Sequence, residues 1–365
     1  MDSDIEPVVV DLGTWMCKAG YAGDKTAQAY ERTLVAKAQP DQLCFGTAAL
    51  QSGEEHELSC PMSRGAVTDW EHMERFLNYV FSKELRSGIA DCSMLVTEVP
   101  NNEQSNRHSL VELMFEKFNI PALYLTIPAC LALYSSGRLT GAVLDIGGSV
   151  THAVAIKNGK ICSTFDDANN TTAMQRINVG GHDVTETLAR TVDARCGTSY
   201  SSSLRRLLQM EYLKERVCIY GESTQHTLPD GTAVEVDEEI RNICAMSHYH
   251  CQGIKSILYD VISACDHGVR PELLKNVIVS GGASMPLGVV DTITSSLRRS
   301  VTSGTGITVV APPERKKSTW LGGSVLASLS TFPEFCKSRR DYQEHGVSYF
   351  DSFCDGEILD KHVDT

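Results

Sequence analysis

The chain has 365 residues, of which 42% are hydrophobic and 22% are charged. This length allows two domains and a large buried core. A formal net charge of -13 disfavours a uniformly basic surface for nucleic-acid phosphates, and no apolar run is long enough to span a bilayer. The acidic start "MDSDIEP" lacks a signal-peptide core, so we expect the 13 cysteines to be reduced thiols in cytosol or nucleus. We therefore expect neither a membrane nor direct nucleic acid as a partner.

The first predicted strand ends at an aspartate, and a glycine lies two residues further on. The stretch "VVVDLGTWMCKAGYA" (8–22) places Asp11, Gly13, Thr14 and Lys18 around this strand end. A glycine just past a strand lets backbone N–H groups approach a phosphate, while a hydroxyl and a lysine supply a donor and a positive charge. An aspartate beside phosphates is repelled unless a cation lies between them. A plain hairpin turn has the same pattern, so one copy is weak evidence.

Strands and helices alternate in the next part of the chain. The segment 93–100 is typical of a buried strand, 104–119 has apolar residues at helical spacing, and 122–127 predicts the next strand. Such alternation predicts an α/β fold with ligands at the carboxyl ends of the strands.

A second Asp-x-Gly segment, "AVLDIGGSVTHAVAI" (142–156), follows in the middle of the chain. Asp145, Gly147 and Thr151 repeat the acid, glycine and hydroxyl of the first copy. Two such hairpins facing each other could hold a polyphosphate from both sides. The two aspartates then imply a divalent ion, most simply Mg²⁺ held partly through water.

In the later part of the chain, a helix is predicted to start at Asp183, where Glu186 completes a capping box. Gly197 is predicted to end this helix. The polar run 201–206 predicts a solvated loop, the segment 318–329 a helix, and 355–365 an acidic tail.

Two further groups of residues bear on ligands. The glycine pair in "SGGASM" (280–285) lets a base or ribose lie against backbone, and a Walker A sequence is absent. Packing is the preferred interpretation of a Cys/His group whose spacing matches no common zinc pattern. Its members are Cys244, His248, His250 and Cys251.

Together these motifs resemble the actin family over nearly the whole chain. "DLGTWMCKAGYAGD" and "DIGGSVTH" resemble the two phosphate loops, "SGGASM" the adenosine loop, and "APPERKKSTWLGGSVLASLSTF" is the most specific match. The resemblance implies an actin-like ATPase fold, in which two duplicated α/β lobes surround a nucleotide cleft. The first lobe would comprise 1–136 and 318–365 with a reduced subdomain 2, and the second 137–317 with a reduced subdomain 4.

The same resemblance implies ATP or ADP with Mg²⁺ (or Ca²⁺) in the cleft. Asp11 and Asp145 would hold the ion through its waters, and Glu215 would accept from the ribose hydroxyls, with Lys214 and Lys316 flanking the base. The other residues that fall at nucleotide contacts are Gly13, Thr14, Lys18, Gly147, Gly148, Ser149, Val150, Gly181, Gly281, Gly282 and Met285.

Several departures from the family pattern put hydrolysis in doubt. Pro128 stands where the family has the glutamine that orients the attacking water, and proline offers no side-chain donor or acceptor. Gly148 and Ser149 replace an aspartate and a glycine of the second phosphate loop, and Asn178 replaces an aspartate. His152, next to the water site in the family, is retained as a possible water contact. We therefore expect weak or no ATPase activity.

Other departures affect assembly. The chain lacks most of the loop between 40 and 44 that inserts into the next subunit of a filament, and its apolar segment after 245 is shortened. These changes favour a non-filamentous subunit of a cytoskeletal or motor-associated complex in the cytoplasm, of the dynactin-like or axonemal dynein-arm type. Its partners would be actin-family neighbours or dynein and dynactin components. A cleft near Tyr134, Leu326 and Phe332 is the candidate partner surface. The alternatives are a filament-forming ATPase actin, a nuclear actin-related subunit of a chromatin remodeller, and a sugar kinase or Hsp70-type ATPase.

Overall fold

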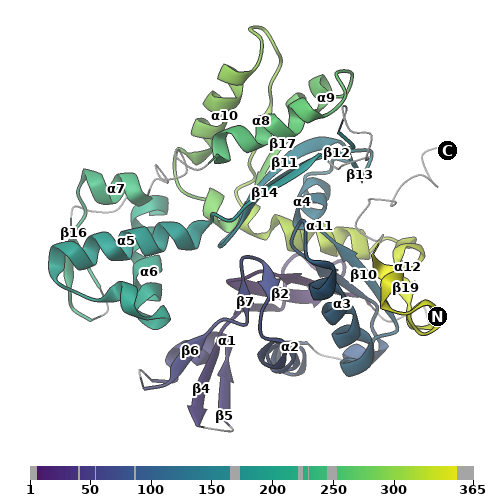
Figure 1. Cartoon of the computed structure of the whole chain (residues 1–365), viewed down its shortest axis with the longest axis horizontal. Helices are drawn as coiled ribbons and strands as arrows, with labels where there is room; N and C mark the ends of the chain where they lie inside the picture. Colours follow the sequence, from purple (N-terminus) through teal and green to yellow (C-terminus); the bar gives the residue numbers. More distant parts are fainter. Residues whose placement is uncertain are drawn as a thin grey trace.

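Two separate β-sheets form the centre of the molecule, and helices cover both (Figure 1). The computed structural model describes residues 6–39, 42–53, 55–85, 88–164, 173–220, 225–228, 230–244 and 253–351. Within these ranges, no helix has the length and apolar character needed to cross a membrane. The predicted α/β fold class is confirmed.

The first sheet has the strand order β19-β10-β9-β1-β2-β3. β1 and β2 form an antiparallel hairpin, whereas β9 and β10 run parallel to β1, as the predicted strand–helix–strand alternation requires. Its strands are β1 (Val8–Leu12), β2 (Met16–Tyr21), β3 (Ala29–Arg32), β9 (Met94–Thr97), β10 (Ala122–Thr126) and β19 (Lys337–Ser338).

Helices on this sheet bury its apolar side chains. The predicted helix 104–119 is present as α3 and a following π-helical turn at Leu113–Lys117. The helices of this part are α2 (Trp70–Glu84), α3 (Gln104–Glu112), α12 (Phe332–Phe335) and α13 (Arg339–His345).

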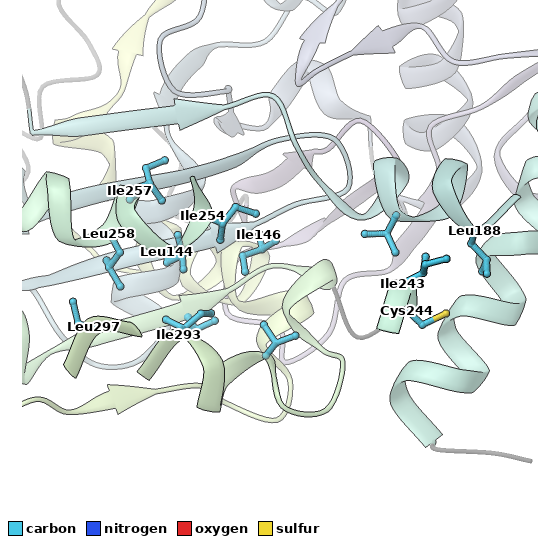
Figure 2. Close-up of a cluster of buried hydrophobic side chains, with 14 of the residues drawn as sticks. Leu144, Ile146, Leu188, Ile243, Cys244, Ile254, Ile257, Leu258, Ile293 and Leu297 are labelled. Atoms are coloured by element: carbon cyan, nitrogen blue, oxygen red, sulfur yellow. The ribbon is translucent and has the colours of Figure 1, made fainter. Parts of the chain in front are cut away.

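The second sheet repeats the motif of the first, with the order β13-β12-β11-β17-β18 and β14 paired to β12. β11 and β12 form the second antiparallel hairpin, and β17 runs parallel to β11. Figure 2 shows its apolar side chains packed with those of the covering helices. The strands are β11 (Gly141–Ile146), β12 (Thr151–Lys157), β13 (Lys160–Ile161), β14 (Met174–Ile177), β17 (Val277–Ser280) and β18 (Val309–Val310), and the helices are α8 (Ile254–Ala264), α9 (Arg270–Lys275) and α10 (Val289–Ser300).

Two helices lie between the sheets and join them: α4 (Pro128–Ser135) and α11 (Ser318–Ala327) (Figure 1). Gly322 explains how they approach so closely, because a Cβ there would lie 1.8 Å from the carbonyl oxygen of Leu131. This close approach explains why a glycine occurs inside the predicted helix 318–329. The packing of α11 against α4 outweighs the low helix propensity of glycine.

Two smaller parts extend from the sheets on either side of a cleft. One is a three-stranded sheet of β4 (Val35–Gln39), β5 (Gln42–Phe45) and β6 (Glu57–Ser59) with α1 (Gly46–Gln51), followed by the hairpin β7 (Met62–Ser63) and β8 (Ala66–Val67). The other consists of α5 (Gly181–Cys196), α6 (Leu204–Tyr220), α7 (Glu238–Cys244), β15 (Gln225–Thr227) and β16 (Ala233–Glu235).

Two predicted boundaries are wrong. α5 begins at Gly181 rather than Asp183, and the carboxylate of Asp183, at the third helical position, accepts from the N–H of Gly180 (2.8 Å). The predicted loop 201–206 is a 3-10 turn that passes into α6, because the Ser203 hydroxyl accepts from the N–H of Arg206 (3.4 Å) as a helix cap. The closing role of Gly197 is confirmed by its φ of 67°.

The Cys/His group of the sequence is only partly visible. Cys244 is a core residue (1% exposed) within the cluster drawn in Figure 2. His248, His250 and Cys251 lie outside the described residues, as does the acidic tail 355–365. Among the residues that the structure describes, no group of three or more His, Cys, Asp or Glu side chains is arranged to hold a metal.

Candidate functional site

A cavity of about 600 Å³ lies between the two β-hairpins, with walls from both sheets and from α5 and α6. The two Asp-x-Gly turns, 134 residues apart along the chain, therefore meet at one site, as expected of facing loops. Thr151 does not line this cavity, but the other phosphate-, ion- and nucleoside-site residues predicted from the sequence do: Asp11, Gly13, Thr14, Lys18, Pro128, Asp145, Gly147, Gly148, Ser149, Val150, His152, Gly181, Lys214, Glu215, Gly281, Gly282, Met285 and Lys316.

The first loop is a tight turn between β1 and β2. The N–H of Gly13 donates to the carbonyl of Met16 (3.2 Å), and a Cβ on Gly13 would lie 2.8 Å from that oxygen, so a side chain does not fit. The Thr14 hydroxyl accepts from the N–H of Gly65 (2.9 Å). Its own O–H is left to donate into the cavity, which suits an anionic ligand.

Asp11 and Lys18 face each other across this hairpin and form a buried ion pair, with Nζ 2.6 Å from Oδ2. The other carboxylate oxygen of Asp11 accepts from the Thr97 hydroxyl (3.3 Å). Burial alone would lower the pKa of Lys18, but the adjacent Asp11 carboxylate outweighs it and raises that pKa. Lys18 is therefore a fixed positive charge at the cavity wall.

The second loop is anchored to the start of α5. The carbonyls of Gly147 and Gly148 accept from the N–H groups of Gly181 (3.0 Å) and His182 (2.7 Å). Gly180 permits this contact, because a Cβ there would lie 2.5 Å from the amide nitrogen of Ser149. The loop and the helix thus form one rigid unit.

Asp145 and His152 occupy in the second hairpin the positions of Asp11 and Lys18 in the first. Asp145 Oδ1, both ring nitrogens of His152 and the Ser280 hydroxyl are buried and have no protein hydrogen-bond partner in the described part of the chain. Burial lowers the pKa of His152 despite the nearby Asp145, so the ring is neutral at pH 7. A buried carboxylate oxygen without a donor fits the water shell of a hard divalent cation.

Thr151 does not take part, contrary to the analogy with Thr14. It is fully buried, and its hydroxyl donates to the carbonyl of Val179 (2.9 Å). The hydroxyl therefore stabilises the strand end instead of facing a ligand.

The remaining predicted residues form the opposite end of the cavity. Gly281 has φ +91°, and a Cβ there would lie 2.2 Å from the carbonyl oxygen of Ile146, so the backbone alone fits. Lys214 donates to the Gly181 carbonyl (2.9 Å) and the Thr185 hydroxyl (2.8 Å), which ties α6 to α5. Desolvation, together with a neighbouring carboxylate, raises the pKa of Glu215.

Pro128 lines the cavity as the first residue of α4. Its place at a helix start explains why proline is tolerated, because the first helical N–H has no intrahelical acceptor and proline lacks that N–H. The fold therefore accepts proline here, and its ring presents no hydrogen-bonding group to the cavity.

Sequence reasoning missed the residues that join the two walls. Arg32 on β3 pairs with Glu211 on α6 (2.5 Å), and Arg64 forms a bidentate pair with Asp183 on α5 (2.7 and 2.8 Å). Trp15, next to Thr14, lines the cavity and packs against His182, with ring centroids 4.3 Å apart and ring planes inclined by 32°. One feature of the sequence indicated this contact, which is the presence of a large aromatic residue inside a turn of the phosphate-binding type.

The candidate partner cleft needs correction. Phe332 is fully buried and Leu326 is 4% exposed, and both pack in the core between the sheets. Tyr134 is partly buried and donates to the Gly159 carbonyl (3.3 Å). The exposed apolar side chains closest in sequence to Leu326 are Val325, in α11, and Leu329, just after that helix.

Comparison with known protein families agrees with this geometry. A family model described as actin matches residues 2–206 and 197–355. The chain belongs to the actin family. Members of this family generally bind a nucleotide with a divalent cation.

Proposed function

We propose that this actin-family protein binds ATP or ADP together with Mg²⁺ (or Ca²⁺) as a largely structural cofactor. The observation that carries the proposal is the unpartnered Oδ1 of Asp145, buried in a cavity that also holds the neutralised Asp11–Lys18 pair. One wall thus offers a fixed cation and a hydroxyl donor for phosphate oxygens. The other offers a carboxylate that needs a cation.

The residues present fit the divalent ion. Asp145 and Asp11 would hold it through its waters, and its charge would offset the repulsion between these carboxylates and the phosphates. Lys18, the Thr14 hydroxyl and the backbone at Gly147 would contact phosphate oxygens. The nucleoside end would lie against the bare backbone at Gly281.

We further propose that hydrolysis is weak or absent. Phosphoryl transfer to water needs an oriented water and charge stabilisation. Lys18 and Asp145 can contribute to the charge, but Pro128 cannot orient a water with its side chain. His152 is neutral and buried beside Asp145, with Nε2 4.0 Å from Oδ2, so it is the remaining group that could contact such a water.

The same protein would act as a non-filamentous subunit or interaction module of a larger cytoskeletal or motor-associated complex in the cytoplasm. The supporting observation is the short connection between β4 and β5, in which Gln39 pairs with Gln42, so little chain remains to reach a neighbouring subunit. Filament growth depends on repeated heterologous contacts, which this shortening removes. Pelleting of the purified protein in Mg-ATP should leave it in the supernatant, and abundant filaments would contradict the proposal.

Ligand-dependent stabilisation tests the nucleotide site. Mg-ATP at a hundred times its dissociation constant should stabilise the protein by about 2.7 kcal/mol and raise its melting temperature. Asp145→Asn should remove the magnesium-dependent part of this increase, which EDTA should also remove from the wild type. Asp291→Asn, at the start of α10 and outside the cavity, is the matched control. A wild-type protein that contains no nucleotide and does not respond to Mg-ATP would contradict the proposal.

A further inference from the structure

The cleft between the two lobes is crossed by an apolar contact centred on one aromatic side chain. Trp15 projects from the first phosphate loop and packs against the ring of His182, the second residue of α5. The two residues belong to opposite walls of the cavity. Their contact therefore joins the first hairpin to the helix that anchors the second.

The second phosphate loop is shaped to receive this ring. A Cβ on Gly148 would lie 2.2 Å from Cδ1 of Trp15 and 3.0 Å from its Cγ, so the indole occupies the space that a side chain at 148 would need. The aspartate expected at this position from the family would not fit beside the ring. The Trp15 ring and the bare backbone at Gly148 are thus complementary in shape.

Apolar side chains from both lobes complete the packing. They form a cluster around three buried residues of the small sheet and α1, with Trp15 packed against it. We call this group the cleft cluster; its buried members are Leu34, Ala36 and Ala49, and its partly buried members are Trp15, Cys44, Leu50, Leu58, Cys60 and, from α6, Leu204 and Leu208.

Polar contacts surround the cleft cluster and bridge the same two parts. Arg205 on α6 donates to the carbonyl of Leu50 (2.5 Å), in addition to the ion pairs Arg32–Glu211 and Arg64–Asp183. Both ion pairs are partly buried, so they stabilise the contact together with the apolar packing. The indole N–H is buried and has no acceptor among the described residues, which shows that packing and not hydrogen bonding holds the ring.

We propose that Trp15 is a positioning residue that latches the two lobes together and holds the two phosphate loops at a fixed separation. All the groups that form the latch belong to the protein, so closure does not require nucleotide. Given the proposed nucleotide site, on which this consequence rests, ligand exchange must break the Trp15 packing and is therefore slow.

The test compares full-length Trp15→Ala with Trp15→Phe, which keeps an aromatic ring and should restore the latch. Without added nucleotide, Trp15→Ala should show at least tenfold faster hydrogen exchange in segments 43–51 and 204–211 and a larger radius of gyration in solution scattering. Trp15→Phe should behave as the wild type. Trp70→Ala removes the same side chain from α2, outside the cavity, and should leave both segments unchanged.

A second measurement addresses exchange. A fluorescent ADP analogue chased with excess ATP should dissociate at least tenfold faster from Trp15→Ala than from the wild type. If wild-type protein does not bind the analogue, the proposed function fails, but hydrogen exchange still decides the latch. Unchanged exchange in both segments of Trp15→Ala would overturn the latch whether or not nucleotide binds.

If Trp15→Ala does not fold, Leu208→Ala tests the contact from the other lobe. It shortens an apolar side chain of α6 in the cleft cluster and leaves Trp15 in place. It should open the same two segments to hydrogen exchange, to a smaller extent. Protection equal to the wild type in this variant would contradict the latch.

Discussion

The two β-hairpins have the same geometry but differ in how their aspartates are satisfied. Asp11 lies opposite Lys18 and accepts from it and from Thr97, so both carboxylate oxygens have donors. Asp145 lies opposite His152, and its Oδ1 has no partner among the described residues. The first hairpin is electrostatically complete without a ligand, whereas the second has an acceptor that only a ligand, an ion or water can satisfy.

This difference assigns a separate task to each half of a duplicated motif. The first hairpin contributes a net-neutral, rigid wall with a lysine that remains charged. The second contributes a buried carboxylate beside a neutral imidazole, and this arrangement favours a cation. Exchanging or removing these groups should therefore have different consequences in the two hairpins.

The largest expected effect is on stability, in the first hairpin. Asp11→Asn leaves the Lys18 ammonium buried without its counter-charge, and breaking a buried ion pair from one side costs about 3–5 kcal/mol. Asp145→Asn removes a carboxylate that has no protein donor on Oδ1, so we expect a loss below about 1 kcal/mol. Denaturant unfolding of both variants, in the absence of nucleotide, measures the difference. Equal losses would show that the two hairpins are not specialised in this way.

The next prediction concerns the attacking water, which Pro128 cannot orient with its side chain. Pro128→Gln supplies an amide at the start of α4, where the backbone accepts any residue with helical φ and ψ. If orientation of the attacking water is what limits hydrolysis, single-turnover cleavage of ATP should become on the order of a hundredfold faster. Pro128→Ala removes the proline without adding an amide and is the control. Wild-type turnover as fast as that of Pro128→Gln would contradict the idea that Pro128 limits hydrolysis.

The sequence predicted the fold class and the positions of the loops because these depend on local patterns. An apolar strand followed by Asp-x-Gly has a restricted set of conformations, and two such copies indicate two related hairpins. The complete pairing of Asp11 was not predictable, because one of its donors is Thr97, which comes from another strand. The start of α5 was misplaced for a similar reason, since the N–H groups of Gly181 and His182 donate to the second loop, which is distant in sequence.

Trp15 was also missed, since nothing in its neighbours along the chain indicates that it packs across the cleft. Gly148→Ala tests that packing directly. The new methyl group would overlap the indole, and such overpacking costs about 1–3 kcal/mol. In a Trp15→Ala background the same substitution should cost little, so a double-mutant cycle of unfolding free energies should show strong coupling. Additive effects would mean that the two residues do not compete for this space.

The smallest expected effect is a pH dependence, which arises at the contact between Trp15 of the first hairpin and His182 of α5. Burial lowers the pKa of His182 below its ordinary value of about 6.5, although the nearby carboxylates oppose this shift. The unfolded chain therefore binds a proton near pH 6.5 that the folded protein does not, so the free energy of unfolding falls as the pH decreases below 6.5. The slope from one such group is at most about 1.4 kcal/mol per pH unit.

His182→Gln should reduce the slope of the unfolding free energy between pH 7 and pH 5. Loss of the ring contact with Trp15 should lower the unfolding free energy by the same amount at every pH. The buried His152 contributes a slope of the same sign, so some dependence should remain in the variant. Urea unfolding at several pH values, at constant ionic strength, separates the slope from the offset. Equal slopes for the wild type and His182→Gln would mean that burial does not hold the His182 imidazole neutral. Its contact with Trp15 would then form with a protonated ring.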